Sequence, residues 1–340
     1  MTTAIAPFQH KRPDTLDQVF QLVGQLIIED RNFIFSGGGT DVIALLKQQL
    51  GEPQTVISLS GLRSLKQIRM LASGRIQIGA MVSLASLITD ANVRELVPTL
   101  AAAARKIASP QIRNQATIGG NVLVTNRCIY FNQSELNRES HAPCFKADGD
   151  ICHVVKSATR EKLPLCQARF VSDTVPVLLL LDAELVFVLP EGERRVAVKD
   201  FFLPDGIYCK DIRRDEVLAF IEIDTRRKKT IHYEKLTVRD TLDFASLGVA
   251  VGIETVDDGD GGETSILSVA LTGVHTHPEF LEFRSTDFGS NAEMVDEGCR
   301  RATRNALTFQ QDQFPRGYRK KMIEVYIRQG IRQLTGNLWI

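Results

Sequence analysis

Apolar residues near the start of the chain follow first helical and then strand-like spacing. Across residues 14–30 they fall on one helical face, and Thr15 and Gln18 have the spacing of a capping box. Phe33–Phe35 is a short apolar run typical of a strand, and helical spacing returns at Val42–Gln49. The pattern therefore predicts a helix, a strand, a loop and a helix in that order, as at the start of an α/β domain.

A second group of elements follows, and a long irregular segment comes after it. The predicted elements are a strand at Thr55–Ser58, a hairpin of Gln67–Met70 with Arg75–Ile78, and helices at Ser83–Thr89 and Val97–Lys106. Regular periodicity is scarce from Gln111 to Cys166. Because compact domains rarely contain so long a segment without regular structure, we expect this one to be functional or disordered.

Periodicity resumes in the second half of the chain with a different character. The predicted elements are a helix at Asp173–Leu181, a strand at Glu184–Leu189, antiparallel strands that include Ser246–Val251 and Ile266–Leu271, and a helical tail from Asn291 to Gln333. The change to an antiparallel pattern places a domain boundary near Ile221–Thr225. We therefore expect one domain at residues 1–221 and a second at 222–340.

Charge and composition narrow the class of protein. Lys and Arg together number 41, as do Asp and Glu, so no net field would hold nucleic acid or an anionic membrane. The longest apolar stretch, Val175–Pro190, is interrupted by Asp182 and Glu184, and Met1–Pro13 lacks the apolar core of a signal peptide. We expect a cytoplasmic protein that binds neither nucleic acid nor membranes.

The run Ser36–Asp41 places three glycines between the first predicted strand and the helix that follows it. Glycine lets the backbone approach a phosphate closely, and the free N–H groups at a helix start favour its negative charge. The run matches neither the G-x-G-x-x-G fingerprint nor the Walker A loop. A phosphate-binding loop and a plain tight turn are equally supported by this run alone.

A second glycine element, Ala116–Asn121, comes directly after the polar run Ser109–Asn114. It can also present backbone amides and polar side chains to a ligand. Two such loops favour a ligand site more strongly than one does.

Four of the six cysteines, Cys128, Cys144, Cys152 and Cys166, lie close together in the irregular segment. Four thiolates are the number that a cubane iron-sulfur cluster needs, and structural zinc also takes four. Zinc ligands usually come in short C-x2-4-C pairs, and the group contains no such pair. Free cysteines are also among the most buried residues. Spacing alone leaves a cluster, a zinc site and scattered buried thiols equally supported.

Other polar groups give weaker signals. His275 and His277 would share one face of a strand but have no evident third ligand, so a metal role is not favoured. Asp257–Glu263 lacks the ligand spacing of an EF-hand and is typical of a solvated hairpin tip. The sequence has no G-x-S-x-G, H-E-x-x-H or P-C-x-x-C signature, which removes the usual support for hydrolases and zinc deaminases.

Several stretches resemble a known family, the FAD-binding subunits of xanthine dehydrogenase-type molybdenum hydroxylases. The matching stretches are Ser36–Asp41, Ile78–Ala80, above all Ile107–Asn121, then Asp173–Pro176, Tyr233–Lys235, Arg239, Asp243–Phe244 and Tyr318–Arg319. The resemblance spans essentially the whole chain and implies an α+β fold. A PCMH-type FAD-binding domain would contain two α/β subdomains, at about 1–58 and 59–221, and a smaller domain of antiparallel sheet plus helices would follow at 222–340.

The resemblance also implies the residues that bind FAD. The first loop would wrap the diphosphate with Ile34, Phe35, Ser36, Gly37, Gly38, Gly39, Thr40, Asp41 and Val42. The second loop would add Ala116, Thr117, Gly120 and Asn121, and the remaining contacts would come from Asp173, Leu218 and Lys235. Lys235 suits the flavin or its phosphates by its charge. No catalytic residue is implied, because substrate chemistry would take place on another subunit.

Most flavin subunits of this family pass almost directly from Gly-Gly-Asn to Asp-x-x-Pro, whereas about fifty residues intervene in this chain. Within them, Asn126–Cys128, Phe131–Gln133 and Asp148–Val155 resemble a loop of 4-hydroxybenzoyl-CoA reductase β subunits, whose four cysteines hold a [4Fe-4S] cluster. This resemblance implies an iron-sulfur loop at about 122–168, with Cys128, Cys144, Cys152 and Cys166 as ligands. The interval before Cys166 is longer than expected, so this fourth ligand is the least supported.

The resemblance implies electron relay in a molybdenum-containing enzyme similar to 4-hydroxybenzoyl-CoA reductase. Electrons from a ferredoxin would pass through the [4Fe-4S] cluster and FAD to a [2Fe-2S] subunit and a molybdenum-cofactor subunit, in a dimer of heterotrimers. One alternative is the FAD subunit of another xanthine dehydrogenase-family enzyme, a heterocycle or aldehyde dehydrogenase, which delivers electrons to NAD or another acceptor. A zinc-binding assembly module and a free-standing flavin oxidase are less supported alternatives.

Overall fold

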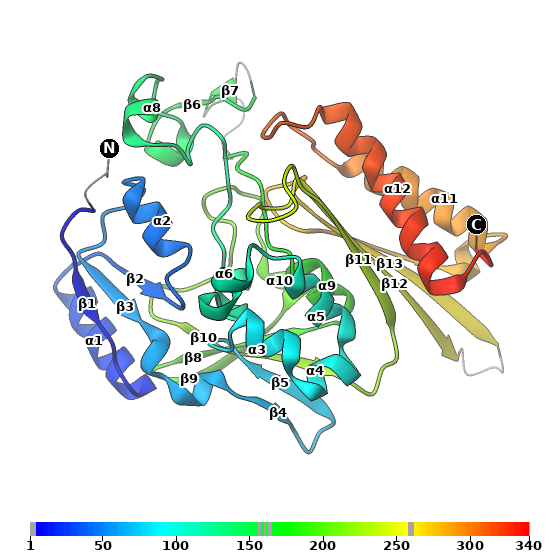
Figure 1. The fold of residues 1–340 in the computed structure, drawn as a ribbon, viewed down its shortest axis with the longest axis horizontal. Helices are drawn as coiled ribbons and strands as arrows, with labels where there is room; N and C mark the ends of the chain where they lie inside the picture. Colours follow the sequence, from blue (N-terminus) through cyan, green and yellow to red (C-terminus); the bar gives the residue numbers. More distant parts are fainter. Residues whose placement is uncertain (1–4, 156–157, 160, 162–164, 258–261, 340) are drawn as a thin grey trace.

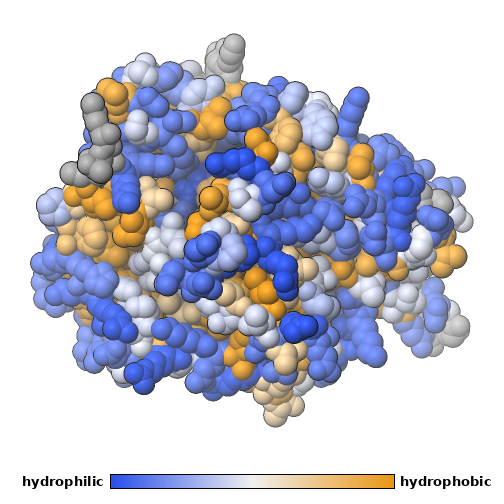
Figure 2. All heavy atoms as spheres, viewed as in Figure 1, coloured by the Kyte–Doolittle hydropathy of each residue, from blue (hydrophilic) through white to orange (hydrophobic). Residues whose placement is uncertain are grey.

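A computed structural model of the chain describes residues 5–155, 158–159, 161, 165–257 and 262–339. Among these residues the strands form three larger sheets and one two-stranded ribbon, and no helix is long and apolar enough to cross a membrane. Figure 1 shows the first sheet at the left, the second below the centre and the third at the right. Polar residues cover most of the face seen in Figure 2, and apolar residues form only small patches on it.

The first sheet is parallel, with β3 between β1 and β2. Its elements are β1 (Gln9–Lys11), α1 (Leu16–Ile28), β2 (Phe33–Ser36), α2 (Val42–Lys47) and β3 (Thr55–Ser58). Thr15 Oγ1 accepts a hydrogen bond from the backbone N–H of Gln18 at 3.3 Å, as the capping pattern predicts. Val19 and Val23 of α1 are buried in one apolar core with Ile57 of β3. The predicted order of elements is confirmed, and β2 leads directly into the glycine run.

The second sheet is antiparallel, with strand order β4-β5-β10-β8-β9. Its strands are β4 (Ile68–Met70), β5 (Arg75–Gly79), β8 (Glu184–Leu189), β9 (Gly192–Ala197) and β10 (Val217–Asp224). The helices of this part are α3 (Leu84–Thr89), α4 (Ala91–Leu96), α5 (Pro98–Arg105), α9 (Val175–Leu180) and α10 (Val198–Phe201). The expected domain boundary near residue 221 falls inside β10, which stays in this sheet up to Asp224.

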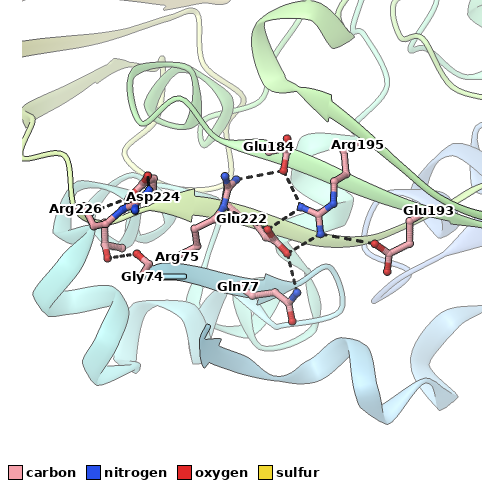
Figure 3. Close-up of polar contacts among 10 residues, drawn as sticks. Gly74, Arg75, Gln77, Glu184, Glu193, Arg195, Glu222, Asp224 and Arg226 are labelled. Carbon is pink, nitrogen blue, oxygen red and sulfur yellow. Dashed lines mark hydrogen bonds and ion pairs between the residues drawn. The ribbon is translucent and has the colours of Figure 1, made fainter. Parts of the chain in front are cut away.

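Figure 3 shows an ion network along this sheet. The Glu222 carboxylate accepts hydrogen bonds from Gln77 Nε2 at 2.8 Å and Arg195 Nη1 at 2.9 Å, and its Oε2 lies 3.3 Å from Arg75 Nε. Burial would raise the pKa of Glu222, but the hydrogen bonds from Arg195 and Gln77 outweigh it and hold this pKa below its usual value. Alternation along the strands directs Ile76 and Ile78 to the apolar core instead.

The third sheet is antiparallel and carries two long helices. Its elements are β11 (Thr230–Leu236), β12 (Leu247–Asp257), β13 (Glu263–Thr272), β14 (Glu279–Arg284), α11 (Asn291–Asn305) and α12 (Arg316–Thr335). Val249 and Val251 share a core with Ile323 and Ile327 of α12, whereas Ala250 belongs to the core around α9. Alternate residues of β12 therefore join the helices on one side and the second sheet's domain on the other.

Two expectations need correction. The segment predicted to lack regular structure from Gln111 onward begins with α6 (Pro110–Gln115) and α7 (Ile118–Val122). Both are short helices with capped N-termini, because Ser109 Oγ accepts from Ile112 N at 3.4 Å and Thr117 Oγ1 from Gly120 N at 3.1 Å. The predicted helical tail is also not continuous, since α11 ends at Asn305 and α12 begins only after Pro315.

The described part of the cysteine segment, residues 123–172, contributes α8 (Glu135–Glu139), β6 (Ile151–Cys152) and β7 (Ala158–Thr159) to the lobe at the top of Figure 1. Short 3-10 helices occur elsewhere and within it, at Leu59–Gly61, Arg63–Lys66, Phe145–Ala147 and Ser285–Asp287. Arg138 fastens the lobe to the end of α2, because its guanidinium donates to the carbonyls of Gln48 at 2.8 Å and Gln49 at 3.0 Å.

Candidate functional site

The glycine run Gly37–Gly39 connects β2 to α2 and lies against the second glycine element. A Cβ on Gly38 would overlap the carbonyl oxygen of Gln115, and a Cβ on Gly37 would lie 2.8 Å from Thr117 Oγ1. Gly39 has a φ of +73°, which side chains rarely tolerate. The glycines are therefore needed for the contact between the two loops as well as for any close approach of a ligand.

The second glycine element is held by its own polar contacts. Asn121 Oδ1 accepts hydrogen bonds from Ser172 Oγ at 2.9 Å and from Thr174 Oγ1 at 2.7 Å. A Cβ on Gly119 would lie 2.7 Å from the carbonyl oxygen of Ala80. These contacts fix Ala116–Asn121 to the residues on both sides of Asp173, so that loops distant in sequence form one wall.

A cavity of about 680 Å³ lies between these loops, and cofactor cavities usually measure about 300–1,000 Å³. The expected FAD residues that line it are Ile34, Phe35, Gly37, Gly38, Gly39, Thr40, Asp41, Val42, Ala116, Thr117, Gly120, Asn121, Asp173 and Leu218. Ser36 instead lines a neighbouring groove on the other side of the glycine run. The size and the two glycine loops fit a dinucleotide cofactor such as FAD, while the individual contacts stay predictions.

Lys235 does not reach the wall of this cavity. Its Nζ lies 3.0 Å from Asp173 Oδ2 and donates to the carbonyl oxygens of Lys106 and Asp243, also at 3.0 Å. Tyr233 donates its hydroxyl to Asp173 Oδ1 at 2.9 Å. Burial raises the pKa of Asp173, although the charge of Lys235 partly offsets this effect. The lysine thus lies behind Asp173 and Asp243, which are the partners of this network that line the cavity.

Sequence reasoning did not assign a cofactor role to several residues of the cavity wall, including Arg127, Asp243 and Phe244. The Arg127 guanidinium pairs with the Asp41 carboxylate and lies over the Phe244 ring, 4.8 Å from its centroid. All three stand inside stretches that carry the family resemblance or its cysteine loop. Only the folded chain reveals that these stretches meet at one cavity.

The four grouped cysteines also come together. Cys128, Cys144, Cys152 and Cys166 line one small cavity, with Phe131, Phe145, Lys146 and His153 among its other residues. Burial raises the pKa of the Cys128 thiol and raises that of Cys166 to about 12. Among the described residues no three His, Cys, Asp or Glu side chains are arranged to hold one metal ion.

A tight turn and the side chain of Lys146 form part of the wall of the cysteine cavity. The backbone N–H groups of Ala147 and Gly149 both donate to the Cys144 carbonyl oxygen, at 2.8 and 2.9 Å, and form a tight turn after this cysteine. Lys146, within this turn, donates to the carbonyl oxygens of Asn126 at 2.8 Å and Gly206 at 3.2 Å. Burial lowers its pKa. A buried cation beside four thiols suits a negatively charged metal-thiolate centre.

Neither of the two remaining cysteines lines the cysteine cavity. Cys209 is buried, with its sulfur 3.2 Å from Lys210 Nζ, and Cys299 is buried in the core under α11. His275 and His277 lie in the turn before β14 rather than on a strand, with their rings 5.3 Å apart. Of the acidic run Asp257–Glu263, residues 258–261 lie outside the described residues; Asp257 ends β12 and pairs with Glu263 in β13.

Comparison with known proteins agrees with this architecture. Residues 6–224 match the family model described as "FAD binding domain in molybdopterin dehydrogenase". The chain is 30% identical over 272 residues to the aldehyde oxidoreductase FAD-binding subunit PaoB of Escherichia coli K12, covering 77% of this chain and 80% of the relative. It is 27% identical over 268 residues to the carbon monoxide dehydrogenase medium chain of Hydrogenophaga pseudoflava, covering 78% and 75%.

Solved structures share the fold. The Cu,Mo-CO dehydrogenase superposes with a TM-score of 0.71 and 22% identity, covering 97% of this chain and 98% of that one. Quinoline 2-oxidoreductase from Pseudomonas putida 86 superposes with a TM-score of 0.69 and 19% identity, covering 99% and 100%. The fold is thus the PCMH-type FAD-binding fold.

The chain belongs to the family of FAD-binding domains of molybdopterin dehydrogenases. It is the FAD-binding subunit of a molybdenum hydroxylase-family enzyme, and so part of an oxidoreductase.

Proposed function

We propose that this subunit carries a [4Fe-4S] cluster in addition to FAD and relays electrons in an enzyme similar to 4-hydroxybenzoyl-CoA reductase. One observation carries the proposal: the four cysteines of the inserted segment line a single cavity, and one of them, Cys128, also lines the flavin cavity. A group held by these thiols would thus lie next to the flavin site, with Cys128 lining both cavities.

A cluster suits the cysteine cavity better than zinc does. One zinc ion holds its four sulfurs about 2.3 Å from the metal, so the sulfurs converge tightly. A cubane cluster binds each thiolate through a different iron and therefore keeps its ligands farther apart. The four cysteines line one cavity, and no three side chains among the described residues are placed to hold a single ion. The family match and some of the relatives' names mention FAD, and none of them mentions a cluster, so this argument depends on the cysteine segment alone.

In this proposal the chain's own residues hold cofactors and exclude water, and substrate chemistry belongs to other subunits. The flavin would supply exchange of electrons singly or in pairs, and the cluster would supply one-electron exchange at a potential set by nearby hydrogen bonds and charges. We infer a ferredoxin as electron donor, and a [2Fe-2S] subunit and a molybdenum-cofactor subunit as partners, in a cytoplasmic dimer of heterotrimers. The substrate would be an aromatic acyl-CoA bound by the molybdenum subunit.

The test is anaerobic quantitation of iron, acid-labile sulfide, zinc and FAD in the purified chain. We expect about four irons and four sulfides with one FAD per chain. Cys128→Ala should lose the iron, whereas Cys299→Ala, which alters a buried cysteine in the core under α11, should keep it. Zinc in place of iron, or equal iron in Cys128→Ala, would overturn the cluster.

A second candidate function follows from the relatives' names. One relative is an aldehyde oxidoreductase FAD-binding subunit at 30% identity, and another is a xanthine dehydrogenase FAD-binding subunit at 27%. The chain could accordingly deliver electrons from an aldehyde or heterocycle dehydrogenase to NAD or another acceptor. One FAD with neither iron nor zinc would favour this function over the cluster-bearing relay.

A further inference from the structure

Arg127 brings a positive charge from the cysteine segment to the flavin cavity. It immediately precedes Cys128, and its side chain lines the same cavity as the glycine run. Its guanidinium pairs with Asp41, at the end of that run, and lies over Phe244, in the turn between β11 and β12. Arg127 therefore joins three separate parts of the chain at the cavity wall.

These contacts leave part of the guanidinium's hydrogen-bonding capacity unused. The Arg127 side chain is only 11% exposed, and its buried Nε has no hydrogen-bond partner among the described residues. Burial lowers the pKa of Arg127 to about 10, so the group still carries its charge at neutral pH. A buried donor without a partner costs free energy. Because Nε is closed to solvent, an anionic group in the cavity would contact the rest of the guanidinium, which shares this cavity with the glycine run.

The other charged residues of the cavity wall already have partners. Arg169, the other cation of the described wall, pairs with Asp312 at 2.6 Å. The carboxylates are paired as well, Asp173 with Lys235, Glu216 with Arg194 and Asp243 with Arg239. The diphosphate of FAD is anionic, and a planar guanidinium can bind phosphate oxygens through two N–H groups. The charge and the position beside the glycine run make Arg127 suited to this diphosphate.

We propose that Arg127 binds the FAD diphosphate and that, through Arg127, the bound flavin fixes the position of Cys128. The backbone N–H and C=O of Arg127 pair with those of Arg169 at 2.8 Å, and the Cys128 N–H donates to Asn132 Oδ1 at 2.9 Å. Anchoring the Arg127 side chain therefore restrains the next residue, Cys128, which lines both cavities. Such coupling is reciprocal, so an ordered Cys128 also favours flavin binding.

The first test measures FAD affinity of the full chain after removal of flavin and metal, by quenching of flavin fluorescence. Arg127→Gln should weaken FAD binding by about ten- to a hundredfold, as expected for loss of a hydrogen bond to a charged group. The FAD affinity of Arg127→Lys should lie between those of the wild type and Arg127→Gln, because lysine keeps the charge but lacks the planar guanidinium. Arg138→Gln is the matched control, since Arg138 also fastens the cysteine segment to α2 but does not line the cavity.

The pairing with Asp41 needs its own control. If Arg127 only neutralises Asp41, the double variant Asp41→Asn/Arg127→Gln should recover the wild-type FAD affinity. If Arg127 binds the diphosphate, the double variant stays weak. Thermal melting of each flavin-free variant reports whether it is folded. Recovery in the double variant, or an affinity of Arg127→Gln within about twofold of wild type, would overturn the proposal.

The second test follows alkylation of Cys128 by iodoacetamide in the metal-free chain, quantified by mass spectrometry. Saturating FAD should slow the reaction in the wild-type chain, and this protection should be lost in Arg127→Gln. Equal protection in both would mean that the flavin merely covers Cys128, and the inferred link would be wrong. Neither test requires iron, so their outcome is independent of whether the cysteine cavity holds a cluster.

Discussion

The flavin cavity and the cysteine cavity meet at Cys128 but are built in different ways. The flavin cavity is lined by loops whose ends are set by regular elements, as where Gly37–Gly39 passes from β2 to α2. The cysteine cavity is lined by a segment in which the longest regular element, among its described residues, is the five-residue helix α8. The first is shaped by the backbone of the sheets and helices. The second depends on side chains that meet with little regular structure to hold them.

The electrostatics of the two cavities differ as well. Around the flavin cavity the buried carboxylate Asp173 already has Lys235 and Tyr233 as partners. In the cysteine cavity, burial favours the neutral thiols of Cys128 and Cys166, although metal ligation requires thiolates. We conclude that the fold prepares the flavin site in advance, whereas the cysteine site would gain much of its order from what it binds.

Metal removal should produce the largest difference between the two regions. Structural metal binding contributes free energy on the order of 10 kcal/mol, and most of it would act on the cysteine segment. After iron is removed, amide hydrogen exchange in peptides from residues 126–155 should accelerate at least about tenfold. Peptides of β2 and α2 should change little. Equal acceleration in both regions would show that the cysteine segment is not a separate unit of stability.

Gly38→Ala should damage the flavin cavity through backbone overlap. The new Cβ would meet the Gln115 carbonyl, which cannot move as a flexible side chain could. We expect destabilisation of about 1–3 kcal/mol in urea unfolding, with loss of FAD content. Gly24→Ala is the control, because a Cβ at this helical position meets nothing within 4 Å. It should stabilise the chain by up to about 1 kcal/mol. Unchanged FAD content in Gly38→Ala would contradict the close contact between the loops.

Alkaline pH should weaken the metal-free chain through Cys166. Burial raises the pKa of this thiol from 9.0 to about 12, so its contribution to stability is complete below pH 9 and is lost as the pH rises toward 12. The slope cannot exceed about 1.4 kcal/mol per pH unit. Between pH 8 and pH 10, the free energy of unfolding measured in urea should fall less for Cys166→Ser than for the wild type.

Cys299 offers a control for this effect, because burial raises its pKa to about 11 as well. Cys299→Ser should reduce the loss of stability at alkaline pH whether or not the chain holds metal. Cys166→Ser should reduce it only in the metal-free chain, since a ligating thiolate no longer titrates. An effect of Cys166→Ser that is the same in both forms would argue against Cys166 as a ligand.

Replacing Lys146 should have the smallest effect of these changes. It should shift the reduction potential of the proposed cluster. A cation stabilises the reduced, more negative state, so Lys146→Met should lower the midpoint potential. Removal of one nearby charge should lower the midpoint potential by tens of millivolts, on the order of 1 kcal/mol, at an effective dielectric constant of about 20. Potentiometric titration followed by electron paramagnetic resonance measures this shift. Lys146→Arg should restore most of the potential, and a rise in Lys146→Met would contradict the reasoning.

Much of the fold could be predicted from local patterns. The strands Thr55–Ser58 and Glu184–Leu189 were predicted with the bounds that the structure has, and the cap at Thr15 was predicted from its spacing with Gln18. These features depend on neighbouring residues only. Helices α6 and α7 were missed because they have six and five residues, too few to show periodicity. Their signals were the caps Ser109 and Thr117, which periodicity does not detect.

The candidate site also has features that could be predicted from neighbouring residues and features that could not. By itself the sequence determined the glycine runs, the four grouped cysteines and the family resemblance, because each is a property of consecutive residues. Only the tertiary structure decided that Lys235 lies behind Asp173, that Arg127 meets Asp41 and Phe244, and that Cys128 lines both cavities. Such contacts join residues far apart in the chain, and the packing of the sheets and loops against one another determines which of them meet.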